Sequence, residues 1–336
     1  MNRTAAQNAP FGSILTDQMG MVTYKNGAWG AAEVVATAAM PMHPAMHALH
    51  YGSSCFEGFK AYRHADGSIH VFRMDRHIAR LQGSARALVL PEPDAAQVAK
   101  LVLKLIDRVR DQVPDAPGAL YLRPLLFGTM PNIGAAATPS NEACLIVLAS
   151  PVWDYFAGGM KPLKILVDTV NQRCAPHLGV VKTGGNYAAA MGPTLAARRQ
   201  WGVDQVLFCP GGEVQETGAA NFVLLADGKL LTRSLDTSFL HGVTRASLLT
   251  IAKDLGYAIE ERVFSVAEML QWARTGEAAL SGTAAVLAGV GTLVHEGQSH
   301  QVGDGQVGPD TRKLRAALVA VQQGEAADRH GWLTKV

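Results

Sequence analysis

The chain has 336 residues, of which 48% are hydrophobic and 17% charged, so it has enough apolar material for two globular domains. Lys and Arg total 30 against 28 for Asp and Glu, without a block of like charge, which argues against a nucleic-acid or anionic-membrane partner. Four widely spaced cysteines without a C-x-x-C pair are typical of reduced thiols in the cytoplasm. Residues 1–10 are polar and predict a loose tail rather than a signal peptide. The longest uncharged stretch, 278–294, is shorter than the ~20 residues of a membrane helix and predicts buried strand and loop.

The first half of the chain alternates predicted strands and helices. Segments 56–63 and 69–73 flank the turn signal Asp66-Gly67 and predict a hairpin. Asp75 is expected to cap a helix that ends before Pro91, and a second helix is expected to open at Asp94. Strands are predicted over 119–129 and 144–150. The first alternates, so Leu120 and Leu122 face one side while Tyr121 and Arg123 face the other.

The segment 151–162 contains two prolines and a Gly-Gly pair, and it predicts a domain boundary. Beyond it we expect strands at 163–168, 205–209 and 222–226, and helices at 243–255, from the capping box Ser265-x-x-Glu268, and at 311–323. Interleaved elements in both halves predict a mixed α/β protein. We expect a small N-terminal domain over 1–150, an interdomain loop over 151–162, and a large C-terminal domain over 163–336 that carries Lys182.

Lys182 stands between β-branched residues and a Gly-Gly pair, in the run Val180-Val181-Lys182-Thr183-Gly184-Gly185-Asn186-Tyr187. This setting favours a desolvated amine that attacks a carbonyl over a solvated surface lysine. Glu216 could keep a pyridine nitrogen protonated, and Tyr187 could donate to a ring oxygen. The alternatives are a turn residue for Glu216 and a core tyrosine for Tyr187. Together the three residues suggest a pyridoxal phosphate enzyme.

Three segments are candidates for holding a phosphate. They are Arg80 on the first helix, the helix start His241-Gly242-Val243-Thr244-Arg245, and the possible backbone nest Ser281-Gly282-Thr283-Ala284. Taken alone, Arg80 reads as an exposed helix residue and the helix start as an ordinary cap.

Five runs resemble a known family when they are taken in order. They are Leu49-His50-Tyr51-Gly52-x-x-x-Phe56-Glu57-Gly58, Leu120-Tyr121-Leu122-Arg123-Pro124, Lys182-Thr183-Gly184-Gly185-Asn186-Tyr187, Gly242-Val243-Thr244-Arg245 and Ser281-Gly282-Thr283-Ala284. The chain resembles branched-chain amino acid aminotransferase, a family of fold type IV pyridoxal phosphate enzymes with a D-amino acid aminotransferase-like fold. The resemblance extends from about residue 18 to residue 291.

The resemblance implies that Lys182 forms the Schiff base with pyridoxal 5'-phosphate and shuttles a proton. It also implies that Glu216 faces the pyridine nitrogen and Tyr187 the ring oxygen, while Arg80, Val243, Thr244 and Thr283 hold the phosphate. Tyr121 and the backbone amides of Thr283 and Ala284 would bind the α-carboxylate. Arg123, helped by Tyr51 and Tyr155, would accept the second carboxylate of glutamate, and Phe56 would join these tyrosines in an apolar pocket.

The implied reaction transfers the amino group of Leu, Ile or Val to 2-oxoglutarate. In the family, Tyr51 and the loop 127–134 work at a dimer interface, so the resemblance implies a homodimer or a dimer of dimers. The chain departs from the family in two places. Pro176 to Val181 replace a glycine-rich loop, and Ala285 to Ala288 replace the C-x-x-C pair of mammalian members, so thiol redox regulation is not expected.

Other readings are open on the residues alone. His43, His47 and His50 have helical spacing for a metal, but Pro44 disfavours a helix there and we expect no metal. A D-amino acid aminotransferase or an aminodeoxychorismate lyase could share Lys182 and Glu216, although the Tyr-Leu-Arg-Pro run favours the branched-chain enzyme. A catalytically silent cofactor binder would not need the proton shuttle.

Overall fold

The computed structural model describes residues 9–153 and 160–336, which form two compact units. Unit 1 contains residues 9–153, Val181–Gly184 and Val321–Val336. Unit 2 contains residues 160–180 and Gly185–Ala320. These units differ from the expected domains at two places, because the short segment around Lys182 and the C-terminal segment pack with unit 1.

Unit 1 is built on a nine-stranded sheet in which every pairing is antiparallel. Its main path runs β17-β6-β5-β7-β8-β1-β2, while β3 pairs with β1 and β4 pairs with β7. The strands are β1 (Gln18–Lys25), β2 (Ala28–Trp29), β3 (Glu33–Ala36), β4 (Ser54–Phe56), β5 (Phe59–Arg63), β6 (Ile69–Phe72), β7 (Ala119–Gly128), β8 (Ala143–Val152) and β17 (Leu333–Lys335).

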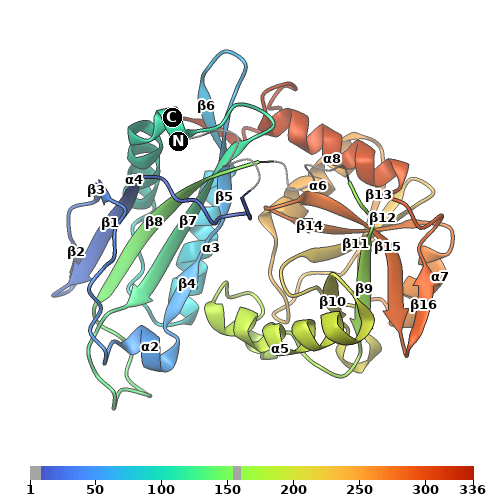
Figure 1. Ribbon diagram of the computed structural model, residues 1–336, viewed down its shortest axis with the longest axis horizontal. Coiled ribbons are helices and arrows are strands. Elements are labelled where there is room, and N and C mark those ends of the chain that lie inside the picture. Colours follow the sequence, from blue (N-terminus) through green and yellow to red (C-terminus); the bar gives the residue numbers. More distant parts are fainter. Residues whose placement is uncertain (1–8, 154–159) are drawn as a thin grey trace. The chain divides into compact units, whose positions relative to one another are not determined.

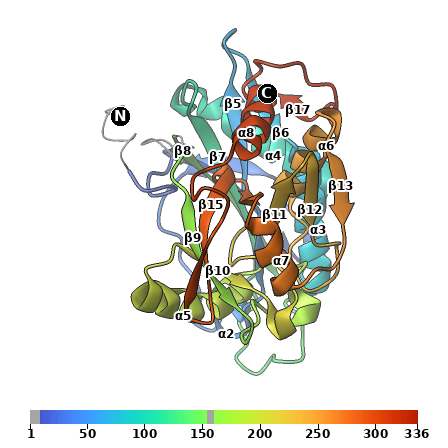
Figure 2. The ribbon, with the colours of Figure 1, turned by 90° about the vertical axis from the view of Figure 1, so that its right-hand side faces the viewer.

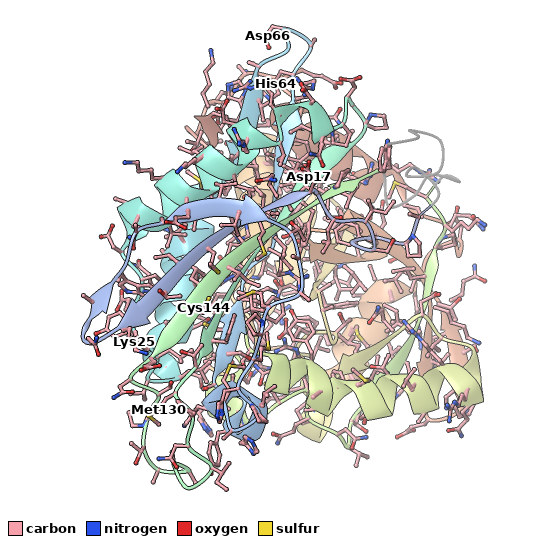
Figure 3. All side chains as sticks on the ribbon, turned by 60° about the vertical axis from the view of Figure 1, so that its left-hand side comes forward. Asp17, Lys25, His64, Asp66, Met130 and Cys144 are labelled. Atoms are coloured by element: carbon pink, nitrogen blue, oxygen red, sulfur yellow. The ribbon has the colours of Figure 1, made fainter. Side chains whose placement is uncertain are left out.

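The predicted hairpin is confirmed as β5 and β6, which pair from Arg63 and Ile69 around a left-handed Gly67. Figure 3 shows His64 and Asp66 at its tip. The first strand begins later than predicted, because Phe56 belongs to the separate strand β4.

Helices α3 (Met74–Ala87) and α4 (Ala95–Arg108) pack against each other and against the sheet (Figure 1). The predicted start of α4 is confirmed, since the Asp94 side chain accepts a hydrogen bond from the Gln97 amide. The predicted cap of α3 is wrong. Arg73 occupies the N-cap position in a left-handed conformation, and Asp75 lies inside the first turn, where its charge complements the helix dipole.

The core of unit 1 lies between these helices and the sheet. The apolar stripes of both helices are buried against alternate residues of the central strands. Leu120 and Leu122 of β7 point into this core, so Tyr121 and Arg123 point to the other face, as predicted. The remaining short helical elements of unit 1 are α2 (His47–Tyr51) and the 3-10 turn Arg110–Gln112.

Unit 2 is built on an eight-stranded mixed sheet. Its main path runs β10-β9-β15-β14-β11-β12-β13, with β16 paired to β15, and three pairings are parallel: β10 with β9, β15 with β9, and β12 with β13. The strands are β9 (Leu163–Asp168), β10 (Gln205–Phe208), β11 (Asn221–Ala226), β12 (Lys229–Thr232), β13 (Ala258–Glu261), β14 (Glu277–Gly282), β15 (Val286–His295) and β16 (Gln298–Gln301).

The helices of unit 2 pack on this sheet. In Figure 2, α7 (Val266–Ala273) runs beside the strands, and it contacts β11 and β14. The Ser265 hydroxyl caps α7 by accepting from the Glu268 amide, which confirms the predicted helix start, while the Glu268 carboxylate accepts from Arg262. Predicted helices are also confirmed as α6 (Val243–Asp254) and as α8 (Pro309–Gln322), which leads into the C-terminal part of unit 1.

The long helix α5 (Gly184–Trp201) was not predicted. It starts with a glycine pair and contains Pro193, and only Asn186, Ala190 and Ala197 are buried along it. The two alanines pack against β9, β10 and β15, as Figure 1 shows for the helix as a whole. Within residues 9–153 and 160–336, no helix combines the length and apolar character needed to cross a bilayer.

Candidate active site

The predicted site residues lie on both units, and each group is described within its own unit. Unit 1 carries Lys182, Arg80 and the substrate residues Tyr51, Phe56, Tyr121 and Arg123. Unit 2 carries Tyr187, Glu216, Val243, Thr244, Thr283 and Ala284. Tyr155 lies outside the described residues.

The backbone around Lys182 is fixed to unit 1 by hydrogen bonds. The Lys182 amide donates to Ser84 Oγ of α3 at 3.1 Å, and its carbonyl accepts from the Phe56 amide of β4 at 2.9 Å. Thr183 Oγ1 donates to the Ser54 carbonyl at 2.7 Å. The lysine side chain is half-buried, with Nζ 5.1 Å from the centroid of the Phe56 ring. These bonds tie the backbone of Lys182 to β4 and α3.

Arg123 and Tyr121 form the polar face of β7. Arg123 donates to the Tyr121 hydroxyl from Nε at 3.1 Å and from Nη2 at 2.8 Å. The Arg123 guanidinium also lies over the Phe56 ring, 4.7 Å from its centroid. Phe56 therefore contacts two cations from its place on β4, one being Arg123 and the other Lys182.

The Tyr121 ring packs closely against the backbone of Gly58. A Cβ at this position would overlap the Tyr121 hydroxyl, so the glycine is required for a close approach between the residues after β4 and the ring. The run Phe56-Glu57-Gly58 thus combines an aromatic surface, a carboxylate and a space for a neighbouring side chain.

Arg80 is not an exposed helix residue, because its side chain is only 14% exposed and pairs with Glu57. Arg80 Nε and Nη2 donate to the two Glu57 oxygens at 2.6 Å and 2.9 Å. His77 Nδ1, one turn earlier on α3, lies 2.7 Å from Glu57 Oε2. Neither Glu57 nor His77 was assigned a role from the sequence.

Burial and charge set the protonation of this group. Burial disfavours the charged form of Glu57, but Arg80 and then His77 overcome it and hold the pKa of the carboxyl well below its ordinary value. Burial lowers the pKa of His77 despite the neighbouring carboxylate. The group is therefore a carboxylate, a guanidinium and a neutral imidazole at neutral pH.

Tyr51 ends α2, is 36% exposed, and donates from its hydroxyl to the Ile133 carbonyl. The His47 amide donates to the Met130 carbonyl and the Asn132 amide to the Ala45 carbonyl, which attaches the same loop to α2 and to the residues just before it. Figure 3 marks Met130 in this loop. His47, considered as a metal ligand from its spacing, has its Nδ1 2.8 Å from Ser53 Oγ.

In unit 2, Glu216 is a buried carboxylate and not an exposed turn residue, since it is 2% exposed. Its Oε1 accepts from Arg173 Nη1 at 2.7 Å and from the Leu240 amide at 2.9 Å. Its Oε2 accepts from Asn221 Nδ2 at 3.1 Å. Arg173, equally buried, also places its guanidinium 5.8 Å from the centroid of the Tyr187 ring. No sequence signal pointed to Arg173.

The N-terminus of α6 lies beside this carboxylate network. Gly242 is the N-cap, and Val243 and Thr244 are buried in the first turn. A Cβ at Gly242 would overlap the side-chain oxygen of Asn221, so glycine lets the helix start approach the residue that binds Glu216. The first turn presents backbone amides at the positive end of the helix dipole, which suits an anion.

Thr283 and Ala284 lie in the turn between β14 and β15. Val286, which follows, has φ of 64°, a left-handed conformation that is costly for a β-branched residue. Ser281, opposite Asn221 across the sheet, has a buried hydroxyl that makes no hydrogen bond within the described residues. Strain and an unsatisfied hydroxyl are both typical of a site that a ligand completes.

The donors on each unit fit pyridoxal phosphate. Unit 1 offers an amine at Lys182 and a guanidinium at Arg80 for a phosphate. Unit 2 offers a buried carboxylate at Glu216, the amides of α6, and the Ser281 hydroxyl. Those are the chemical types that a pyridine aldehyde with a phosphate requires.

Comparison with known proteins agrees with this chemistry. The model of the class IV aminotransferases matches residues 54–292. A branched-chain-amino-acid aminotransferase from Mycobacterium tuberculosis is 40% identical over 97% of this chain and 92% of its own. A probable one from Streptomyces coelicolor is 39% identical with the same coverage.

Solved structures are similar over nearly the whole chain. The branched-chain amino acid aminotransferase of T.th. with pyridoxamine 5'-phosphate has a TM-score of 0.77 at 26% identity, covering 93% of this chain and 97% of its own. The enzyme from Escherichia coli has a TM-score of 0.73 at 29% identity, with coverages of 94% and 98%. The expected fold type IV architecture is thereby confirmed. The chain belongs to the class IV aminotransferases and, within them, to the branched-chain-amino-acid aminotransferase family.

Proposed function

We propose that the protein transfers the amino group of L-Leu, L-Ile or L-Val to 2-oxoglutarate, giving the branched-chain 2-oxo acid and L-glutamate in two half-reactions. The observation that carries the proposal is the arrangement on unit 1, where the Lys182 amine and the Arg123 guanidinium lie 5.1 Å and 4.7 Å from the centroid of the same Phe56 ring. It supplies an apolar surface, a reactive amine and a carboxylate-binding cation. Relatives that are 39% and 40% identical carry the name of this activity.

Pyridoxal phosphate, when bound, supplies the aldehyde and the electron-withdrawing ring on which amino-group transfer depends. The Lys182 amine would take the proton from the substrate Cα and deliver it to C4′ of the cofactor, and it would move a proton in the opposite direction in the second half-reaction. Glu216 keeps its negative charge toward the ring nitrogen, and Tyr187 donates to the ring oxygen. Arg80, Val243, Thr244 and Thr283 hold the phosphate.

The pocket must accept both an aliphatic side chain and a carboxylate. Phe56, Tyr51 and Tyr155 give the aliphatic chain an apolar surface. Arg123 binds the second carboxylate of glutamate or 2-oxoglutarate, since a buried carboxylate without a partner costs several kcal/mol. Tyr121, with the amides of Thr283 and Ala284, binds the α-carboxylate. A glutamate adduct and 4-methylvaleric acid, each bound to the enzyme of T.th. in a solved structure, support both substrate types.

The protein acts as a homodimer or as a dimer of dimers. The supporting feature is an apolar surface on unit 1, formed by α2 and the loop that it binds. Its exposed side chains include Leu49 (60%) of α2 and Ile133 (69%) of the loop, and the Tyr51 hydroxyl binds the Ile133 carbonyl. We place the protein in the cytoplasm, where its four free cysteines remain reduced.

The test follows the cofactor absorbance in separate half-reactions with L-Leu, L-Ile, L-Val, L-Glu, D-Ala and aminodeoxychorismate. We expect the cofactor absorbance to change with the four L-amino acids and with neither of the other two compounds. Reaction with D-Ala, or pyruvate release from aminodeoxychorismate, would instead identify a D-amino acid aminotransferase or a lyase. Lys182→Ala is the control, because it should eliminate the visible cofactor absorbance shift and every half-reaction. Turnover in that variant would contradict the assignment of Lys182.

A further inference from the structure

The inference concerns the buried group on unit 1 formed by Glu57, His77 and Arg80. We propose that Glu57 and His77 are positioning residues that hold the Arg80 guanidinium in one orientation for the phosphate of the cofactor. This rests on the proposed function, in which Arg80 binds that phosphate.

The geometry of the group restricts Arg80 to one orientation. Its Nε and Nη2 form a two-pronged contact with the two Glu57 oxygens, which fixes the plane of the guanidinium as well as its distance. That contact uses one edge of the guanidinium. Because the plane is fixed, the direction from which the guanidinium can meet an oxyanion is fixed as well.

Glu57 is itself held on three sides. His77 Nδ1 lies 2.7 Å from Oε2, and the Gly58 amide donates to the same oxygen at 3.2 Å. The Glu57 amide donates to the Pro124 carbonyl of β7 at 2.8 Å. Because Glu57 is completely buried and His77 is 2% exposed, neither residue can turn into solvent. The orientation of Arg80 is therefore tied to the sheet.

His77 adds a contact without adding a charge. Its ring stacks on Phe59 with centroids 5.1 Å apart, and its buried imidazole is neutral because burial lowers its pKa. A neutral ring that donates a hydrogen bond from Nδ1 fixes the carboxylate in place. The net charge of Glu57 and Arg80 together stays zero. The group thus supplies orientation rather than net positive charge.

If Arg80 acts through its charge alone, Glu57→Gln should have the opposite effect on phosphate binding from the one expected if Glu57 orients Arg80. Glu57→Gln removes the negative charge nearest to Arg80 at almost unchanged volume. If Arg80 acted only through its charge, phosphate binding would become tighter, because an uncompensated cation attracts an oxyanion more strongly. If Glu57 acts by positioning, phosphate binding becomes weaker.

The experiment titrates cofactor-free protein, prepared from the holoenzyme, with pyridoxal phosphate and with pyridoxal, which lacks the phosphate. The ratio of the two dissociation constants isolates the phosphate contribution. For Glu57→Gln we expect affinity for pyridoxal phosphate to fall at least tenfold, with affinity for pyridoxal within twofold of wild type. Unchanged or tighter binding of pyridoxal phosphate would overturn the inference, and so would equal losses for both ligands.

Two further variants keep the test decisive if Glu57→Gln fails to fold. His77→Phe preserves the stack on Phe59 but removes the donor to Glu57, and we expect a phosphate-specific loss of about threefold. Arg80→Lys keeps the charge without the two-pronged contact, and we expect a loss of tenfold or more. Wild-type affinity in both variants would refute positioning.

The matched control is Glu92→Gln. Glu92 pairs with Arg86, which is on the same helix as Arg80, but both side chains are exposed. This variant should bind both ligands as wild type does, and a phosphate-specific loss in it would also refute the inference. Arg80→Ala tests the binding of the phosphate by Arg80 separately from the positioning of Arg80 by Glu57 and His77. It should remove the preference for pyridoxal phosphate over pyridoxal. If it does not, the assignment of Arg80 fails. If it does and Glu57→Gln binds normally, only the positioning role fails.

Discussion

The buried pair of Arg173 and Glu216 should couple strongly in the stability of unit 2. Each side chain is 2% exposed, and the charged atoms are 2.7 Å apart. Glu216→Gln leaves the Arg173 charge buried without a counterion, and Arg173→Met leaves the carboxylate without its cation. Breaking a buried pair from one side costs about 3–5 kcal/mol, so each single variant should lose that much in the free energy of unfolding.

The double variant Arg173→Met with Glu216→Gln should lose less than either single variant. It leaves no buried charge at this pair, and the glutamine oxygen can still accept a hydrogen bond from the Leu240 amide, which in the wild type donates to Glu216. Simple addition would instead predict a loss of about 6–10 kcal/mol. We expect a loss of about 2 kcal/mol, because the desolvation cost disappears when both charges are removed.

The measurement is the unfolding of the cofactor-free protein in urea, monitored by circular dichroism. Its control is the exposed pair of Lys229 and Glu260, at 3.6 Å, where Lys229→Met and Glu260→Gln should each cost no more than about 1 kcal/mol. Losses at Arg173 and Glu216 that add to within about 0.5 kcal/mol would refute the argument, because additivity means that the two charges do not depend on each other.

Other substitutions test the site and its surroundings. Gly179→Ala should destabilise the loop before the lysine, because a Cβ there overlaps the backbone of Ser238 and Phe239; a thermal unfolding midpoint equal to wild type would contradict this. Arg123→Ala should slow the half-reaction with 2-oxoglutarate by about tenfold to a hundredfold more than that with L-Leu, as expected for a lost charged hydrogen bond of about 1.5–3 kcal/mol; equal losses would make Arg123 structural. A thiol reagent at neutral pH should label the native protein slowly, since burial raises the pKa of Cys55 and Cys209 to about 12 and of Cys144 to about 11, and also raises that of Cys174. All of the thiols should react at once after denaturation, and fast labelling of native protein would show that the thiols are accessible.

The elements that the sequence predicted well are those with a local signal. Asp94 and Ser265 cap their helices through their own side chains, and Gly67 adopts the turn conformation that its type favours. Helix α5 lacks such a signal, because it begins with two glycines and buries small residues instead of an apolar stripe. Its stability comes from packing on β9, β10 and β15, which a pattern along the chain does not contain.

The site residues also divide into those with a local sequence signal and those that depend on tertiary packing. Lys182 and Arg123 stand out in sequence because each is a charged residue in an apolar or alternating segment. Glu57, His77 and Arg173 were missed as partners, because residues far apart along the chain become hydrogen-bond partners only through tertiary packing. The chemistry could thus be inferred from the sequence, whereas the groups that hold it in place could not.

On each unit, the charge that we propose for cofactor binding is paired with an opposite charge of the same unit. On unit 1 the Arg80 guanidinium is bound by Glu57, and on unit 2 the Glu216 carboxylate is bound by Arg173. In both cases the partner is almost fully buried, so it cannot be exchanged for water when the ligand arrives. A side chain whose orientation is fixed by protein partners needs little reorganisation when it binds a ligand, and this lowers the free-energy cost of binding. Keeping the net charge alone is therefore not enough at these positions. A lysine at Arg80 or an aspartate at Glu216 would keep the charge but lose the fixed direction, and cofactor affinity should fall in both.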